Sequence, residues 1–279
     1  MNNQVEVMSD TVLPYNPTNI LFEDEDLTKI LTRFGVHEPH KDINVYRRAF
    51  VNRSYCTRKN ENYVNGNMNC PDNCMPLQEE SNERLEFFGD SILGNVIAKY
   101  LFDRYPQQNE GFLTTMRTKL VNGNKLAELS KEVGLQKFLI ISSQIEENNG
   151  RENRNILEDT LEAFIGAIYI DFDDGSDSHG FVVARQWIVG LIEETVDFVE
   201  LIRGNINYKD KLVKHCQYAC QYVPLFEEVA TSDRKKGGNC KVVVKSNTGM
   251  IIAVGVERTR KAAEIEAAKK ALQYFGQPV

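Results

Sequence analysis

The sequence has no long hydrophobic run, and nowhere do the roughly 18–20 successive apolar residues of a membrane-spanning helix occur. The first residues, Met1 to Glu6, combine neither a basic flank nor an apolar block, which argues against a secretion signal. Cysteine is scarce, with six among 279 residues, too few for a disulfide scaffold. We therefore expect an intracellular, most simply cytoplasmic, protein with reduced thiols and no membrane partner.

The composition is that of a globular protein, with 42% hydrophobic and 26% charged residues. The length of the chain is enough for about two domains. The net charge of −7 averages two unlike parts. Residues 205–279 contain 13 Lys and Arg against seven Asp and Glu, a balance of +6, which leaves 20 basic and 33 acidic residues, or −13, for residues 1–204. A basic module beside an acidic one suggests a polyanion-binding part next to a cation-binding part, although drift in surface charge would give the same numbers.

Helical spacing of apolar residues begins at about residue 24, after a polar segment, residues 1–23, that we expect to be a loose leader. Residues 56–81 are rich in Asn, contain two prolines and lack periodicity, which indicates an inserted loop. Long helices are predicted over residues 82–105, 155–172 and 178–201, with a polar gap over residues 142–154 and no strand pattern. The sequence thus predicts an all-helical domain over residues 24–203.

The last part, residues 204–279, has a different pattern. A helix is predicted over residues 210–222 and another over residues 259–275, with three short β-branched segments between them at 224–230, 240–245 and 250–256. Residues 246–249, with the sequence Ser-Asn-Thr-Gly, suit a hairpin turn between the last two strands. The order α-β-β-β-α predicts a small α+β module after the helical domain.

Acidic side chains recur at helical spacing in two of the predicted helices. Glu83, Glu86 and Asp90 share one face of the first helix, and Asp159 and Glu162 share a face of the second, each beside an apolar stripe. If the two faces meet, the carboxylates repel one another unless a hard divalent cation neutralises them, and oxygen ligands favour Mg²⁺ or Mn²⁺ over Zn²⁺. Ordinary solvated acids next to a core stripe would show the same spacing.

The first acidic helix closely resembles the signature motif of the ribonuclease III family: residues 82–93 read Asn-Glu-Arg-Leu-Glu-Phe-Phe-Gly-Asp-Ser-Ile-Leu, with Phe88 where Leu is usual. Residues 49–55, 110–121 and 156–171 resemble other blocks of that family, in its order. The resemblance implies that four carboxylates bind Mg²⁺ (Mn²⁺ as a substitute) and are catalytic: Glu86, Asp90, Asp159 and Glu162. It implies supporting roles for Glu83 and Glu110, and insertion of Phe87 into a partner subunit.

The basic module resembles a double-stranded RNA-binding domain, in its α-β-β-β-α order and in residues 259–272 of its last helix. Cations at the start of that helix suit phosphates, because they add to the positive end of the helix dipole. The residues expected to bind RNA are Lys209, Lys235, Lys236, Arg260 and Lys261. The module departs from the family pattern at Lys214, where Glu is frequent, and in the loop at 231–239, which lacks the usual Gly-Pro-x-His.

Together these resemblances imply an endoribonuclease that hydrolyses both strands of double-stranded RNA, leaving 5′-phosphate and 3′-hydroxyl ends with short 3′ overhangs. One set of carboxylates per chain implies a homodimer, since each set cuts one strand. One alternative is a non-catalytic protein that sequesters double-stranded RNA on the same fold, and another is an unrelated helical phosphohydrolase. A zinc site at Cys56, Cys70 and Cys74 is disfavoured, because no fourth ligand lies nearby.

Overall fold

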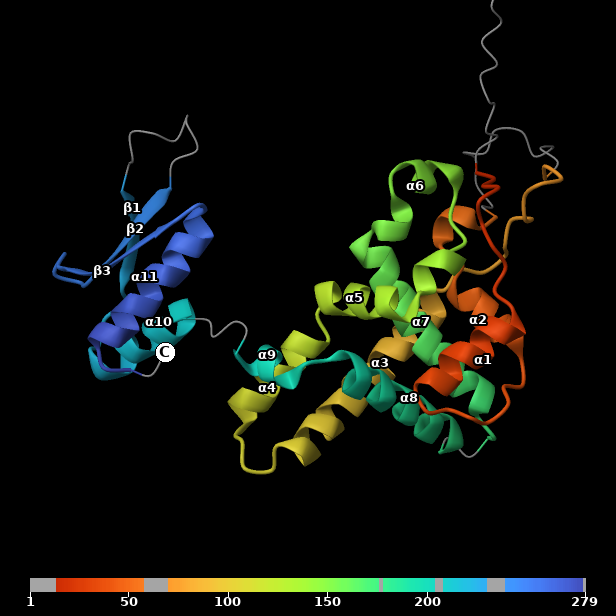
Figure 1. The fold of residues 1–279 in the computed structure, drawn as a ribbon, viewed down its shortest axis with the longest axis horizontal. Helices are drawn as coiled ribbons and strands as arrows, with labels where there is room; N and C mark the ends of the chain where they lie inside the picture. Colours follow the sequence, from red (N-terminus) through yellow and green to blue (C-terminus); the bar gives the residue numbers. More distant parts are fainter. Residues whose placement is uncertain (1–13, 58–69, 176–177, 204–207, 230–238, 278–279) are drawn as a thin grey trace, which may run out of the picture. The chain divides into compact units, whose positions relative to one another are not determined.

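The computed structural model describes residues 14–57, 70–175, 178–203, 208–229 and 239–277 (Figure 1). The chain forms two compact units, Met1–Val196 and Asp197–Val279. The boundary between them lies seven residues before the one expected from the sequence, between residues 203 and 204. Each unit is described by itself. None of the helices among the described residues is long and apolar enough to cross a membrane.

The first unit is helical, as predicted. Its helices are α1 (Asp24–Arg33), α2 (Ile43–Ala49), α3 (Glu83–Arg104), α4 (Glu110–Leu120), α5 (Gly123–Val133), α6 (Ser143–Glu147), α7 (Arg154–Phe172) and α8 (His179–Thr195). The helix α7 packs against α2, α3, α5 and α8 (Figure 1). Its residues 160–168 are all buried, which is the pattern of a helix enclosed by others.

The helix predicted over residues 178–201 is broken. α8 ends at Thr195, and α9 (Phe198–Arg203) begins after Asp197, whose carboxylate accepts hydrogen bonds from the backbone N–H groups of Val199 and Glu200. A side chain that caps a new first turn explains the break, because it satisfies donors that have no partner within the helix. The polar gap predicted over residues 142–154 contains the short helix α6, capped in the same way by Ser142.

The expected loose leader is wrong for residues 14–23, because several residues of this segment, Tyr15, Asn16 and Phe22 among them, are buried against the core. Phe22 is 1% exposed, and its ring centroid lies 4.6 Å from that of Phe50 and 4.8 Å from that of Phe138. The buried Asn16 amide donates to the carbonyl of Ile141 at 3.1 Å. Only residues 1–13 of the predicted leader lie outside the described residues.

The predicted insert, residues 56–81, is fixed where it is described. Residues 56 and 78 form an isolated parallel bridge, with the N–H of Thr57 donating to the carbonyl of Gln78. The hydroxyl of Tyr55 donates to the carbonyl of Met75 at 2.7 Å. The two ends of the insert are therefore held together just before α3 begins, while residues 58–69 lie outside the described part.

The second unit contains α9, α10 (Tyr208–Ala219), β1 (Leu225–Val229), β2 (Cys240–Lys245), β3 (Ile251–Glu257) and α11 (Arg260–Tyr274). The strands form an antiparallel sheet in the order β1-β2-β3, with Gly249 at φ +83° in the turn between β2 and β3. Small side chains let α11 pack closely on the sheet, and α10 packs on α11, through a core that includes Leu212, Val244, Ala267 and Ala271. The predicted α-β-β-β-α module is confirmed.

Candidate metal centre and RNA-binding module

The metal centre is built where α3 crosses α7, and two glycines set the distance between the helices. A Cβ atom on Gly89 would lie 2.6 Å from the carbonyl carbon of Glu162, and one on Gly166 would lie 3.2 Å from that of Leu85. The backbones therefore touch at these positions, and no larger residue fits without separating the helices. This contact brings the acidic face of α3 against the acidic face of α7.

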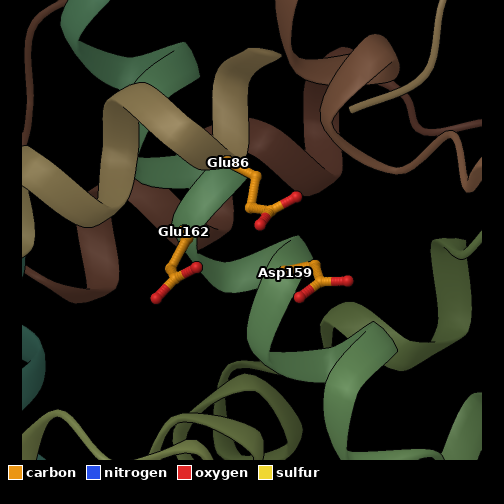
Figure 2. Close-up of side chains that lie close together, drawn as sticks. All are labelled: Glu86, Asp159 and Glu162. Atoms are coloured by element: carbon orange, nitrogen blue, oxygen red, sulfur yellow. The ribbon is translucent and has the colours of Figure 1, made fainter. Parts of the chain in front are cut away.

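Three carboxylates converge at this crossing. Glu86 from α3 and Asp159 and Glu162 from α7 each offer an oxygen atom, and these atoms all lie within 4.8 Å of one another (Figure 2). Glu162 is buried, at 8% exposed, and the other two are half-buried. The structure thus brings together three of the four residues expected to bind metal.

The other three predicted acids, Asp90, Glu83 and Glu110, are not among the converging carboxylates. Asp90, one turn after Glu86 on α3, is exposed but close enough for its charge to raise the pKa of Glu162. Glu83 is exposed and accepts from the Ser81 hydroxyl at 3.0 Å. Glu110 begins α4, where it accepts from its neighbour Thr114, and it is not brought to the three carboxylates within this chain.

Burial and mutual repulsion raise the pKa values of the three converging carboxylates. Burial, followed by the charges of Glu86 and Glu158, raises the pKa of Asp159 to about 6. Burial, followed by the charges of Asp90 and Glu158, raises the pKa of Glu162 to about 8. The pKa of Glu86 is raised as well, again mainly by burial. The group is therefore a poor place for three negative charges unless a positive charge joins them.

The donor set fits a hard divalent cation. It contains only carboxylate oxygens, which suit Mg²⁺ or Mn²⁺, and it lacks the thiolates and imidazoles of structural zinc sites. A cation would also relieve the repulsion that the two packed helices impose on the three side chains.

Cation binding at this centre should depend on pH, because a bound cation must displace the protons held by Glu162 and Asp159. With pKa values of about 8 and about 6, both groups gain negative charge as the pH rises, so affinity should increase between pH 6 and pH 8. Calorimetric titration with Mn²⁺ in two buffers of different ionisation enthalpy measures both the affinity and the protons released. An affinity that stays constant over this range would contradict the electrostatics of the site.

Sequence reasoning missed Glu158, although its charge raises the pKa of all three clustered carboxylates, Glu86, Asp159 and Glu162. The available signal was its position four residues before Glu162, which places the two side chains on neighbouring turns of α7.

In the second unit, the predicted RNA-binding cations of the two helices are organised around one acid. Glu264 on α11 accepts from Lys209 at 2.7 Å and from Arg260 at 3.0 Å. Lys261, next along α11, is exposed and makes no ion pair with any described residue. Lys235 and Lys236 lie in residues 230–238, outside the described part.

A hollow of about 530 Å³ lies beside Phe87, whose side chain is 77% exposed on α3. Its walls combine the apolar side chains of Leu85, Phe88 and the exposed Ile170 with charged residues, which are Arg48, Glu83 and Arg84. An exposed aromatic ring beside a partly apolar hollow is typical of an interaction surface rather than of the core.

Comparison with known families gives two matches. Residues 83–173 match the family described as Ribonuclease III domain, and residues 208–275 match the Double-stranded RNA binding motif. The first match contains α3 to α7 and every residue of the carboxylate cluster. The second contains α10, the sheet and α11.

Individual relatives cover most of the chain. It is 32% identical over 247 residues to Ribonuclease 3 of Streptococcus gordonii, covering 88% of this chain and 94% of that protein. It is 30% identical over 266 residues to the Probable ribonuclease 3 of Acanthamoeba polyphaga mimivirus, covering 94% of this chain but only 47% of that longer protein. The solved nuclease domain of ribonuclease III from Campylobacter jejuni is 31% identical, with a TM-score of 0.47, and the match covers 62% of this chain and 97% of that one.

Proposed function

This chain belongs to the ribonuclease III family, and we propose that it hydrolyses both strands of double-stranded RNA with Mg²⁺ held by four carboxylates. It joins the domain of a double-strand-specific endoribonuclease to a double-stranded RNA-binding domain. The proposed ligands are Glu86, Asp90, Asp159 and Glu162, with Mn²⁺ as a substitute metal. The observation that carries the proposal is the convergence of three of these carboxylates at the glycine crossing of α3 and α7.

The protein's own residues have separate tasks in this proposal. Glu86, Asp159 and Glu162 hold the cation at one place between two packed helices, and Asp90 adds charge from the exposed side, where RNA can approach. When bound, the cation activates water and stabilises the charge that develops on the phosphate. The second unit supplies affinity for the duplex, whose A-form shape and phosphates are recognised without reading sequence.

The test of this function uses long duplex RNA incubated with the full chain in Mg²⁺ and, separately, in EDTA. We expect cleavage only with Mg²⁺, and products with 5′-phosphate, 3′-hydroxyl and short 3′ overhangs. Stable binding of the duplex without cleavage in Mg²⁺ would favour a sequestering protein on the same fold. Clustered carboxylates argue against that alternative, because a protein that only binds RNA gains nothing from acids near phosphates.

We further propose that two chains associate through the face around Phe87. A two-fold interface is self-complementary, so the exposed ring of one chain can enter the hollow of the other, and the reverse. Two sets of carboxylates then become available for the two strands of one duplex.

Replacement of Phe87 with Glu should therefore convert dimers to monomers and abolish double-strand cuts, because a charge would have to be buried in the hollow. Sedimentation velocity at micromolar concentration measures the change in mass. Phe102, 65% exposed fifteen residues further along α3, gives the matched control, since its replacement with Glu should leave the dimer intact. Equal dimer content in all three proteins would overturn the proposed interface.

RNA binding by the second unit should rest in part on Lys261. Its replacement with Ala should weaken duplex binding and lower the slope of log affinity against log salt concentration by about one, as expected for one phosphate contact. Fluorescence anisotropy with labelled duplex at several salt concentrations measures both. The control is Lys270→Ala, which removes a cation that pairs with Glu266 at 3.0 Å near the other end of α11, and it should leave the slope unchanged.

A further inference from the structure

Glu158 occupies a space that a glycine leaves open. Its carboxylate lies against Gly123, the first residue of α5, and a Cβ atom built there would overlap the carboxylate oxygen and lie 2.8 Å from its carbon. No side chain larger than that of glycine fits at this position unless the Glu158 carboxylate moves away.

The surroundings favour a negative charge at this point. The first turn of α5 presents the positive end of the helix dipole, which stabilises a carboxylate placed there. The cap of α5 is already made by Asn122, whose side chain accepts from the N–H of Lys125. Glu158 is therefore not needed as the N-cap of this helix.

Glu158 is also close to the metal centre without belonging to the converging group. It lies directly before Asp159 and four residues before Glu162, which places the Glu158 and Glu162 side chains on neighbouring turns of α7. The oxygens within 4.8 Å of one another are those of Glu86, Asp159 and Glu162 alone among the described residues. A like charge on the next turn of a helix is destabilising unless something positive compensates it.

We propose that Glu158 is a positioning residue of the metal centre, which raises its affinity for a divalent cation from outside the ligand group while Gly123 keeps room for it. This inference rests on the proposed function of the same site. An outer carboxylate acts by adding negative charge beside the ligands, and removal of such an outer group typically lowers metal affinity about tenfold or more.

The test measures Mn²⁺ binding to the full chain without RNA, from the electron paramagnetic resonance signal of free Mn²⁺. Glu158→Gln should weaken binding about tenfold. Gly123→Ala should weaken it to a similar extent, because the new Cβ displaces the end of a flexible side chain and leaves the backbone in place. The double variant should bind no more weakly than Glu158→Gln, since Gly123 acts only through Glu158.

Two further proteins separate this inference from the proposed function. Glu147→Gln changes an exposed glutamate at the end of α6 and should bind Mn²⁺ like the wild type. Glu162→Gln should lose far more affinity than Glu158→Gln. Wild-type affinity in Glu158→Gln, or additive losses in the double variant, would overturn the role of Glu158 alone. A wild-type chain that binds no Mn²⁺ would overturn the metal centre and this inference together.

Discussion

Replacement of Glu162 with Gln is expected to lower the rate of duplex RNA cleavage by about three orders of magnitude or more, while duplex binding stays within about twofold. Gln keeps the size of the side chain and removes the charge that the cation requires. Glu162 is the most deeply buried of the three converging acids, so no water-exposed carboxylate can take its place. RNA binding should stay intact, because the proposed RNA contacts are made by cations of the second unit.

The measurements are single-turnover cleavage with Mg²⁺ and anisotropy with the same duplex, and Glu147→Gln is the control with unchanged values for both. Loss of binding together with cleavage would contradict the assigned role, as would cleavage at the wild-type rate. A comparison of several Mg²⁺ concentrations separates weak metal binding from a defect in chemistry.

Glu162→Gln, which lowers the cleavage rate, should raise the stability of the metal-free protein at high pH. The pKa of Glu162 is about 8 in the folded protein, above its usual value of 4.5, so the folded state holds a proton that the unfolded chain releases. Without a cation, the free energy of unfolding therefore falls as the pH rises from about 4.5 to about 8. Gln does not ionise, so above pH 8 in EDTA the variant should melt at a higher temperature than the wild type.

Replacement of Gly89 with Ala is expected to lower the free energy of unfolding of the first unit by about 3 kcal/mol or more, the upper range for an overpacked core. The added methyl group would overlap the backbone of Glu162, which cannot rotate away as a side chain can. Relief requires α3 and α7 to move apart, which also separates Glu86 from Glu162. Cation affinity should fall together with stability.

A matched substitution lies on the same helix. A Cβ atom on Gly94 meets nothing within 4 Å, so Gly94→Ala should stabilise α3 by up to about 1 kcal/mol through helix propensity. Urea unfolding of both variants measures the difference. If the two substitutions had similar effects, the close crossing of α3 and α7 would not be what assembles the metal centre.

The acids of the metal centre could be predicted from the sequence because helical spacing and a family motif both place them on two helix faces. From the sequence, Gly89 was recognisable only as an unusual glycine inside a predicted helix. The glycine is needed because its backbone contacts that of Glu162, 73 residues further along the chain. The pairing of Lys209 with Glu264 was not predictable, since it joins two helices that the sheet separates in sequence, whereas Arg260 and Glu264 are four residues apart on one helix. The packing of Phe22 was missed because the apolar run Ile20-Leu21-Phe22 is too short to show a period and stands in an otherwise polar segment.

The burial of Phe22 also decides where a shortened version of this protein can begin. Its ring lies 6.3 Å from that of Phe164 on α7, between centroids, and contacts the rings around Phe50. A truncation that starts at α1 would remove this ring and leave a hole in the aromatic layer beneath the helix that carries two of the metal-site acids. Expression boundaries for crystallisation or display should therefore fall before Pro14, so that the buried residues Tyr15, Asn16 and Phe22 are all kept.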